Sequence, residues 1–133
     1  MAGEDAPRAS DPREPTDAMT LLLDPQAIEQ IRVVERAIGR HDLFSELVTK
    51  LEGNLNGFGP AWLDLIARGD TVGATRAAHT LKGTCRQLGA AALGELFADI
   101  ERAAKAGDYA AAKRKFDAGG TLITQSLEAL KSA

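Results

Sequence analysis

The chain lacks the features that mark a membrane protein or a secreted one. No apolar run approaches the roughly 18–20 residues that a membrane span needs. The first residues, Met1-Ala2-Gly3-Glu4-Asp5, do not place a basic segment before an apolar one as a signal peptide does. The single cysteine, Cys85, excludes an internal disulfide framework. We therefore expect a cytoplasmic protein that does not enter a membrane.

Aromatic and β-branched residues are also scarce, which disfavours a protein built from strands. Alanine and leucine dominate the 44% of the chain that is hydrophobic, and both favour helices. A length of 133 residues fits one domain that can bury a core. We predict an all-α protein.

The charges divide the chain into two parts. The first 18 residues hold five acidic and two basic side chains among three prolines, and we predict that residues 1–18 form a disordered acidic tail. The bundle domain is then residues 19–133. Outside the tail, 14 acids balance 14 bases, so no basic stripe indicates nucleic-acid binding.

Helical spacing of apolar residues predicts five helices, over residues 25–36, 43–68, 71–88, 90–106 and 109–131. An aspartate precedes four of them as a candidate N-cap, at Asp24, Asp42, Asp70 and Asp108. The connections are short, so the four longer helices should form an antiparallel up-down-up-down bundle, with the first helix covering one end.

Two of these helices carry interruptions. In the helix over 43–68, an unbroken apolar seam favours one kinked helix, whereas Gly57, Gly59 and Pro60 favour a break. In the helix over 109–131, the pair Gly119-Gly120 predicts local softness, since each glycine costs about 1 kcal/mol relative to alanine.

The helix over 71–88 carries the most informative stretch, from Ala78 to Gly89. Its apolar stripe lies beside His79, which should leave that side chain at the surface, with Lys82 and Gly83 on the same face. An imidazole is nucleophilic near pH 7 because its unperturbed pKa is about 6.5. Lys82 could neutralise the charge of an incoming phosphoryl group, and Gly83 leaves room for a partner.

The surroundings of His79 extend this site. No acidic side chain occurs between Asp70 and Glu95, whereas three bases do: Arg76, Lys82 and Arg86. Arg76 and Arg86 should extend the positive field, and Thr75 and Gln87 are candidates for contact with a partner. Nothing in the chain predicts a metal site, and no Gly-rich nucleotide loop is present.

The run His79-Thr80-Leu81-Lys82-Gly83, followed after four residues by Leu88-Gly89, resembles the signature of histidine-containing phosphotransfer (HPt) domains. Gly69-Asp70 before it also fits this family, as does the segment from Leu93 to Glu101 after it, so the likeness covers roughly residues 20–131. Arg86 departs from the pattern, because the family more often has a small residue there. The departure leaves the shape of the docking surface open.

The resemblance implies that His79 accepts a phosphoryl group in a two-component phosphorelay. Such domains carry the group between aspartates of receiver domains and have no kinase or phosphatase activity of their own. It implies response-regulator receivers, or the receiver of a hybrid histidine kinase, as partners, and Mg²⁺ held by the receiver while this chain needs no cofactor. We also expect a monomer. The alternative is a helical docking module whose positive face binds partners while His79 stays unmodified.

Overall fold

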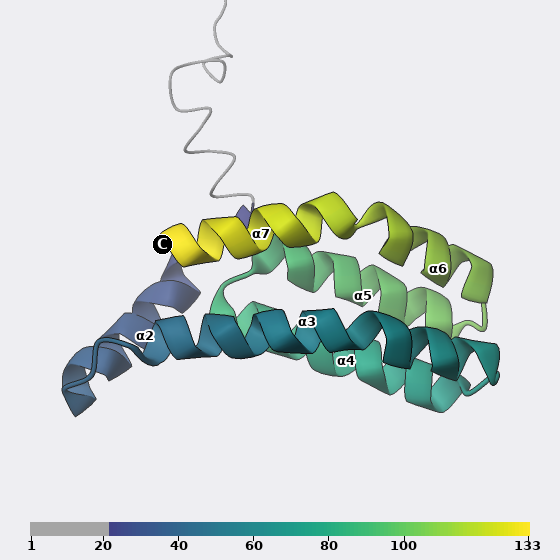
Figure 1. The fold of residues 1–133 in the computed structure, drawn as a ribbon, viewed down its shortest axis with the longest axis horizontal. Coiled ribbons are helices and arrows are strands. Elements are labelled where there is room, and N and C mark those ends of the chain that lie inside the picture. Colours follow the sequence, from purple (N-terminus) through teal and green to yellow (C-terminus); the bar gives the residue numbers. More distant parts are fainter. Residues whose placement is uncertain (1–21) are drawn as a thin grey trace, which may run out of the picture.

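The computed structural model describes residues 22–133, and every regular element in this part of the chain is helical. The helices are α2 (Pro25–Ile38), α3 (Leu43–Ala67), α4 (Thr71–Leu88), α5 (Ala91–Lys105), α6 (Tyr109–Ala118) and α7 (Gly120–Ser132). Helices α3, α4, α5 and the α6–α7 pair run as antiparallel rods, and α2 lies across one end (Figure 1). The predicted all-α bundle with an additional N-terminal helix is confirmed.

The predicted tail, residues 1–18, lies outside the described residues. Among residues 22–133, no helix has both the length and the apolar character that crossing a membrane requires.

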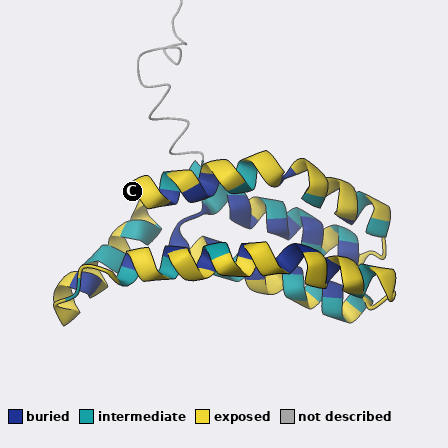
Figure 2. Ribbon diagram, viewed as in Figure 1, coloured by how far each residue is buried: buried dark blue, intermediate teal, exposed yellow. Residues whose placement is uncertain are grey.

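The core follows the apolar seams, and each rod turns its buried residues inward (Figure 2). Four aromatic rings fill its centre, with Phe58 stacked on Trp62 at 5.7 Å between centroids and edge-on to Phe97 at 5.1 Å. Phe116 completes the cluster. The buried Trp62 indole donates a hydrogen bond of 3.2 Å to the Ala74 carbonyl, which fixes α3 against α4.

Helix α3 is one continuous helix through Gly57, Gly59 and Pro60, so the break is excluded. The seam explains this result, because Phe58 and Trp62 on either side of the glycine and proline are both buried in the same aromatic cluster. Packing of that face outweighs the hydrogen bond that proline removes.

The single helix predicted over 109–131 is wrong, because the chain forms α6 and α7 instead, divided at Gly119. Two adjacent glycines weaken the helix there. Gly119 is also buried so closely that a Cβ would lie 2.6 Å from Leu96 Cδ2. The fourth rod of the bundle is therefore two helices in series.

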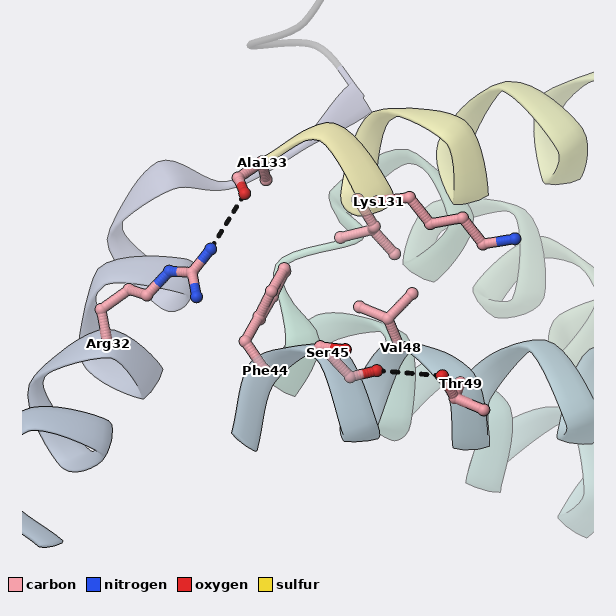
Figure 3. Close-up of a pocket in the computed structure, with 8 residues that line it drawn as sticks. Arg32, Phe44, Ser45, Val48, Thr49, Lys131 and Ala133 are labelled. Atoms are coloured by element: carbon pink, nitrogen blue, oxygen red, sulfur yellow. Dashed lines mark hydrogen bonds between the residues drawn. The ribbon is translucent and has the colours of Figure 1, made fainter. Parts of the chain in front are cut away.

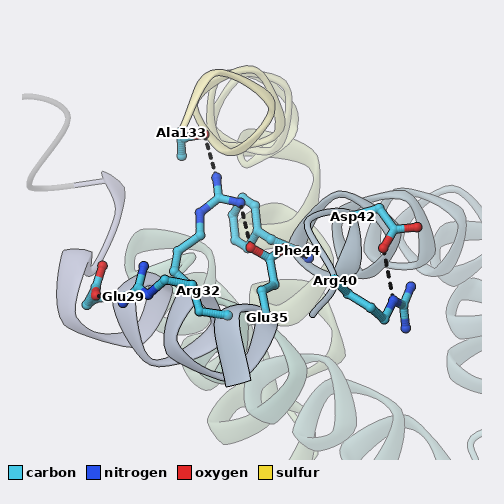
Figure 4. A network of polar contacts seen from close by, with 8 residues as sticks. Glu29, Arg32, Glu35, Arg40, Asp42, Phe44 and Ala133 are labelled. Atoms are coloured by element: carbon cyan, nitrogen blue, oxygen red, sulfur yellow. Dashed lines mark hydrogen bonds and ion pairs between the residues drawn. The ribbon is translucent and has the colours of Figure 1, made fainter. Parts of the chain in front are cut away.

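Asp42 precedes α3 as predicted, but its side chain does not cap the helix. Its carboxylate accepts a hydrogen bond of 2.9 Å from Arg40 instead. The buried Glu35 of α2 accepts the Phe44 backbone N–H at 2.8 Å, and Arg32 pairs with Glu35 at 3.2 Å (Figure 4). The Phe44 hydrogen bond lowers the pKa of Glu35. Glu35 of α2 thus accepts a backbone N–H in the first turn of α3, and this hydrogen bond joins α2 to the bundle.

Gly89 serves two purposes at the turn between α4 and α5. Its φ of +89° ends α4 in the left-handed conformation, which glycine adopts without strain. Its carbonyl accepts a hydrogen bond of 2.7 Å from the Asp24 N–H, and a Cβ there would lie 2.7 Å from Ile28. The same glycine therefore lets α2 approach the end of α4.

Candidate functional site

Helix α4 presents His79 at the surface, as the sequence predicts. Asp70 caps the helix by accepting the Gly73 N–H at 2.8 Å. The predicted inward stripe is buried, namely Ala74, Ala78, Leu81, Cys85 and Leu88. Because this stripe fixes the rotation of α4, the side chain of His79 is left 63% exposed. Burial also raises the pKa of the Cys85 thiol to about 12, which keeps that group unreactive.

Glu101 of α5 holds the imidazole from one side. Its Oε2 lies 2.9 Å from His79 Nδ1, and its Oε1 lies 2.7 Å from Lys82 Nζ. The Glu101 side chain is only 19% exposed and that of Lys82 only 20%. The hydrogen bond from Lys82 is the main cause that lowers the pKa of Glu101, followed on the same side by the bond to His79, while burial opposes both. Glu101 is therefore an anion at neutral pH.

This contact selects one form of the neutral histidine. An ionised carboxylate can only accept hydrogen bonds, so the hydrogen of the neutral ring must be on Nδ1. The other ring nitrogen, Nε2, then carries the free lone pair. The arrangement has the features of an activated nucleophile: an exposed side chain, a fixed orientation and an acceptor behind it.

The predicted positive field around His79 is partly neutralised by α5. Lys82 pairs with Glu101, and Arg86 pairs with Glu95 at 3.2 Å. Arg76 is exposed and has no ion-pair partner among residues 22–133. A count of charges along α4 alone cannot include the acids that the next helix brings against it.

Gly83 lies in open space, since a Cβ at this position would have no neighbour within 4 Å. Close packing between helices therefore does not explain this glycine. Its openness agrees with the prediction that it leaves the surface beside His79 accessible.

Arg86, the departure from the family pattern, lies against α5. A Cβ at Gly94 would be 2.8 Å from Arg86 Cγ, so the absence of a side chain at Gly94 makes space for the arginine stem. The stem is thereby held along α5, and its guanidinium group reaches Glu95. Gln87 is exposed, whereas the Thr75 hydroxyl is buried and has no hydrogen-bond partner within the described part of the chain.

A shallow pocket of about 400 Å³ adjoins His79, and it includes residues that the sequence analysis did not single out. It is lined by Thr71, Val72, Thr75, Arg76, His79, Glu101 and Lys105. The position of the turn at Gly89 could have predicted which residues of α5 lie opposite His79. His79 lies ten residues before Gly89 and Glu101 twelve after it, so antiparallel helices bring the two together.

A second pocket, of about 280 Å³, lies where α2, α3 and α7 meet, away from His79 (Figure 3). The guanidinium group of Arg32 in this pocket already donates hydrogen bonds to the Ala133 carbonyl, at 2.9 Å, and to Glu35. Across residues 22–133, no three His, Cys, Asp or Glu side chains gather as a metal site would require.

Comparison with known proteins identifies the family. The sequence model of the Hpt domain family matches residues 42–133. These residues include the whole of α3 to α7 and leave α2 outside. The sensor histidine kinase AruS of Pseudomonas aeruginosa is 34% identical over 90 residues, which are 68% of this chain and 9% of that protein. No solved structure is significantly similar. The chain therefore belongs to the Hpt domain family, whose members take part in phosphotransfer in two-component signalling.

Proposed function

We propose that this protein is a phosphorelay carrier that moves a phosphoryl group between receiver-domain aspartates through phosphorylated His79. One observation supports this proposal above the others. Glu101 Oε2 lies 2.9 Å from His79 Nδ1, so that nitrogen is engaged in a hydrogen bond and Nε2 is free to react. The His79 side chain is 63% exposed, so a partner can reach it.

The transfer step needs no acid or base from this chain. The Nε2 lone pair forms the N–P bond while the P–O bond of the aspartyl phosphate breaks and its electron pair returns to the aspartate carboxylate. The ring keeps its Nδ1 hydrogen and gains positive charge, which the Glu101 carboxylate stabilises. In the reverse direction His79 is the leaving group.

The receiver domain would bring the acceptor aspartate and its Mg²⁺, so His79 needs no metal of its own. We infer that the partners are response regulators, or the receiver of a hybrid histidine kinase, and that this chain has neither kinase nor phosphatase activity. We further infer that it acts in the cytoplasm as a monomer.

The surface around His79 suits the docking of a folded partner. Gly83 leaves open space beside the histidine, and the exposed Gln87 and Arg86 lie farther along α4. The paired Arg86 and Glu95 would present a charged edge that a partner must match.

Incubation with a phosphorylated receiver tests the proposal against a docking module. Radiolabel should move to the wild-type protein as an acid-labile adduct, and none should move to the His79→Gln variant, although both bind the receiver. If the wild type binds receivers of its host and takes no label from any of them, the protein is a docking module and the carrier proposal fails.

A further inference from the structure

Two positively charged side chains that line the pocket beside His79 form no ion pair within residues 22–133. Arg76 of α4 and Lys105, the last residue of α5, both line it, and neither has an ion-pair partner among the described residues 22–133. Lys82, by contrast, is 80% shielded from solvent and lies 2.7 Å from Glu101.

The direction of helical side chains places this pocket on the side toward which His79 leans. Each side chain of an α-helix is tilted toward the N-terminus and covers the preceding turn. For His79 that turn holds Thr75 and Arg76, which line the pocket with it, whereas Lys82 and Gly83 lie on the following turn.

The charges of the pocket favour an anion. Arg76 and Lys105 contribute two positive charges, and the single acid of the lining, Glu101, is already shared between Lys82 and His79. The volume of about 400 Å³ exceeds what a phosphoryl group fills, so an aspartate side chain can enter with it.

From this arrangement we infer that the phosphoryl group on His79 lies in this pocket and that Lys105 and Arg76 contact its oxygens. Lys82 is then a positioning residue, which holds Glu101 against the imidazole. The inference rests on the proposed function, since it concerns the phosphorylated state of His79.

The test measures the phosphorylated state itself. Protein labelled at His79 with phosphoramidate, which needs no protein partner, is titrated and followed by ³¹P NMR. A nearby cation favours the dianionic phosphoryl group, so Lys105→Ala and Arg76→Ala should each raise the pH at which the ³¹P resonance titrates. Lys113→Ala, which removes the same charge from an exposed position on α6, should leave that pH unchanged.

The transfer equilibrium with a phosphorylated receiver provides a second readout. A residue that only contacts the receiver changes the rate, whereas one that contacts the phosphoryl group changes the final share of phosphohistidine. Lys105→Ala and Arg76→Ala should each lower the equilibrium constant about threefold, as expected for a partly exposed charge pair, and Lys105→Arg should restore it.

The inference is overturned if Lys105→Ala behaves as Lys113→Ala does in both measurements. It is also overturned if only Lys82→Ala moves the ³¹P titration. If phosphoramidate labels His79 but no receiver does, the carrier proposal fails, and the ³¹P titration alone decides whether the pocket holds the phosphoryl group.

Discussion

Replacing Glu101 with glutamine tests whether its carboxylate fixes the ring hydrogen of His79 on Nδ1 and stabilises positive charge on the ring. Glutamine keeps the size of the side chain but removes the negative charge, and its amide can donate as well as accept. If the amide donates to His79 Nδ1, the ring hydrogen moves to Nε2, and the nitrogen that should attack the phosphoryl group loses its lone pair.

The charge effect can be estimated from the geometry. With Oε2 at 2.9 Å from Nδ1, the carboxylate lies about 4 Å from the centre of the ring. At that distance a unit charge on the ring is stabilised by about 1 kcal/mol in water and about 4 kcal/mol at a protein surface. Because His79 is 63% exposed, we take a value near the lower end, about 1.4 kcal/mol, which corresponds to a tenfold slower transfer.

Single-turnover transfer of radiolabel from a phosphorylated receiver measures this rate. Asp99→Asn is the matched control, because it removes an acid from the same helix that pairs with Arg102. We expect Glu101→Gln to be about tenfold slow and Asp99→Asn to equal the wild type. Equal rates for all three proteins would refute a role for Glu101 in preparing His79.

Three further predictions concern stability and can be checked by chemical or thermal unfolding. Gly83→Ala should stabilise the fold by about 0.5–1 kcal/mol, since the new methyl group meets open space and alanine favours the helix; a loss of stability would contradict the open geometry. Leu51→Ala should destabilise it by about 2–5 kcal/mol, because Leu51 is fully buried in the core; a loss below 1 kcal/mol would show loose packing there. Because the pKa of Glu101 is lowered, its ionised form stabilises the folded state at pH values above the usual pKa of 4.5, and this stabilisation is lost as the pH falls through the lowered pKa. The melting temperatures of the wild type and of Glu101→Gln should therefore converge in acid and remain apart at pH 7.

The sequence was sufficient to predict features that depend on one helix at a time. The seam of α4 predicted which side is buried, and therefore that His79 is exposed. Periodicity across Pro60 correctly favoured one helix, because Phe58 and Trp62 pack in the same cluster on either side of it.

Features that depend on two helices could not be predicted in the same way. Glu101 reaches His79 from α5. Glu35 of α2 accepts the Phe44 N–H at the start of α3, where the sequence predicted Asp42 as the N-cap. The pair Gly119-Gly120 indicated a soft point in the sequence, but not the close approach of Gly119 to Leu96. In each case a tertiary contact decides between local alternatives, and periodicity contains no information about it.

We propose that Glu101 holds Nδ1 of His79 and leaves Nε2 to accept the phosphoryl group. A ³¹P–¹H correlation spectrum of the protein labelled by a phosphorylated receiver tests it most directly. Phosphorus on Nε2 couples to both carbon-bound ring hydrogens of His79, whereas phosphorus on Nδ1 couples only to the one between the two nitrogens. We predict both correlations; a single correlation, or phosphorus attached to another residue, would contradict phosphorylation of His79 at Nε2.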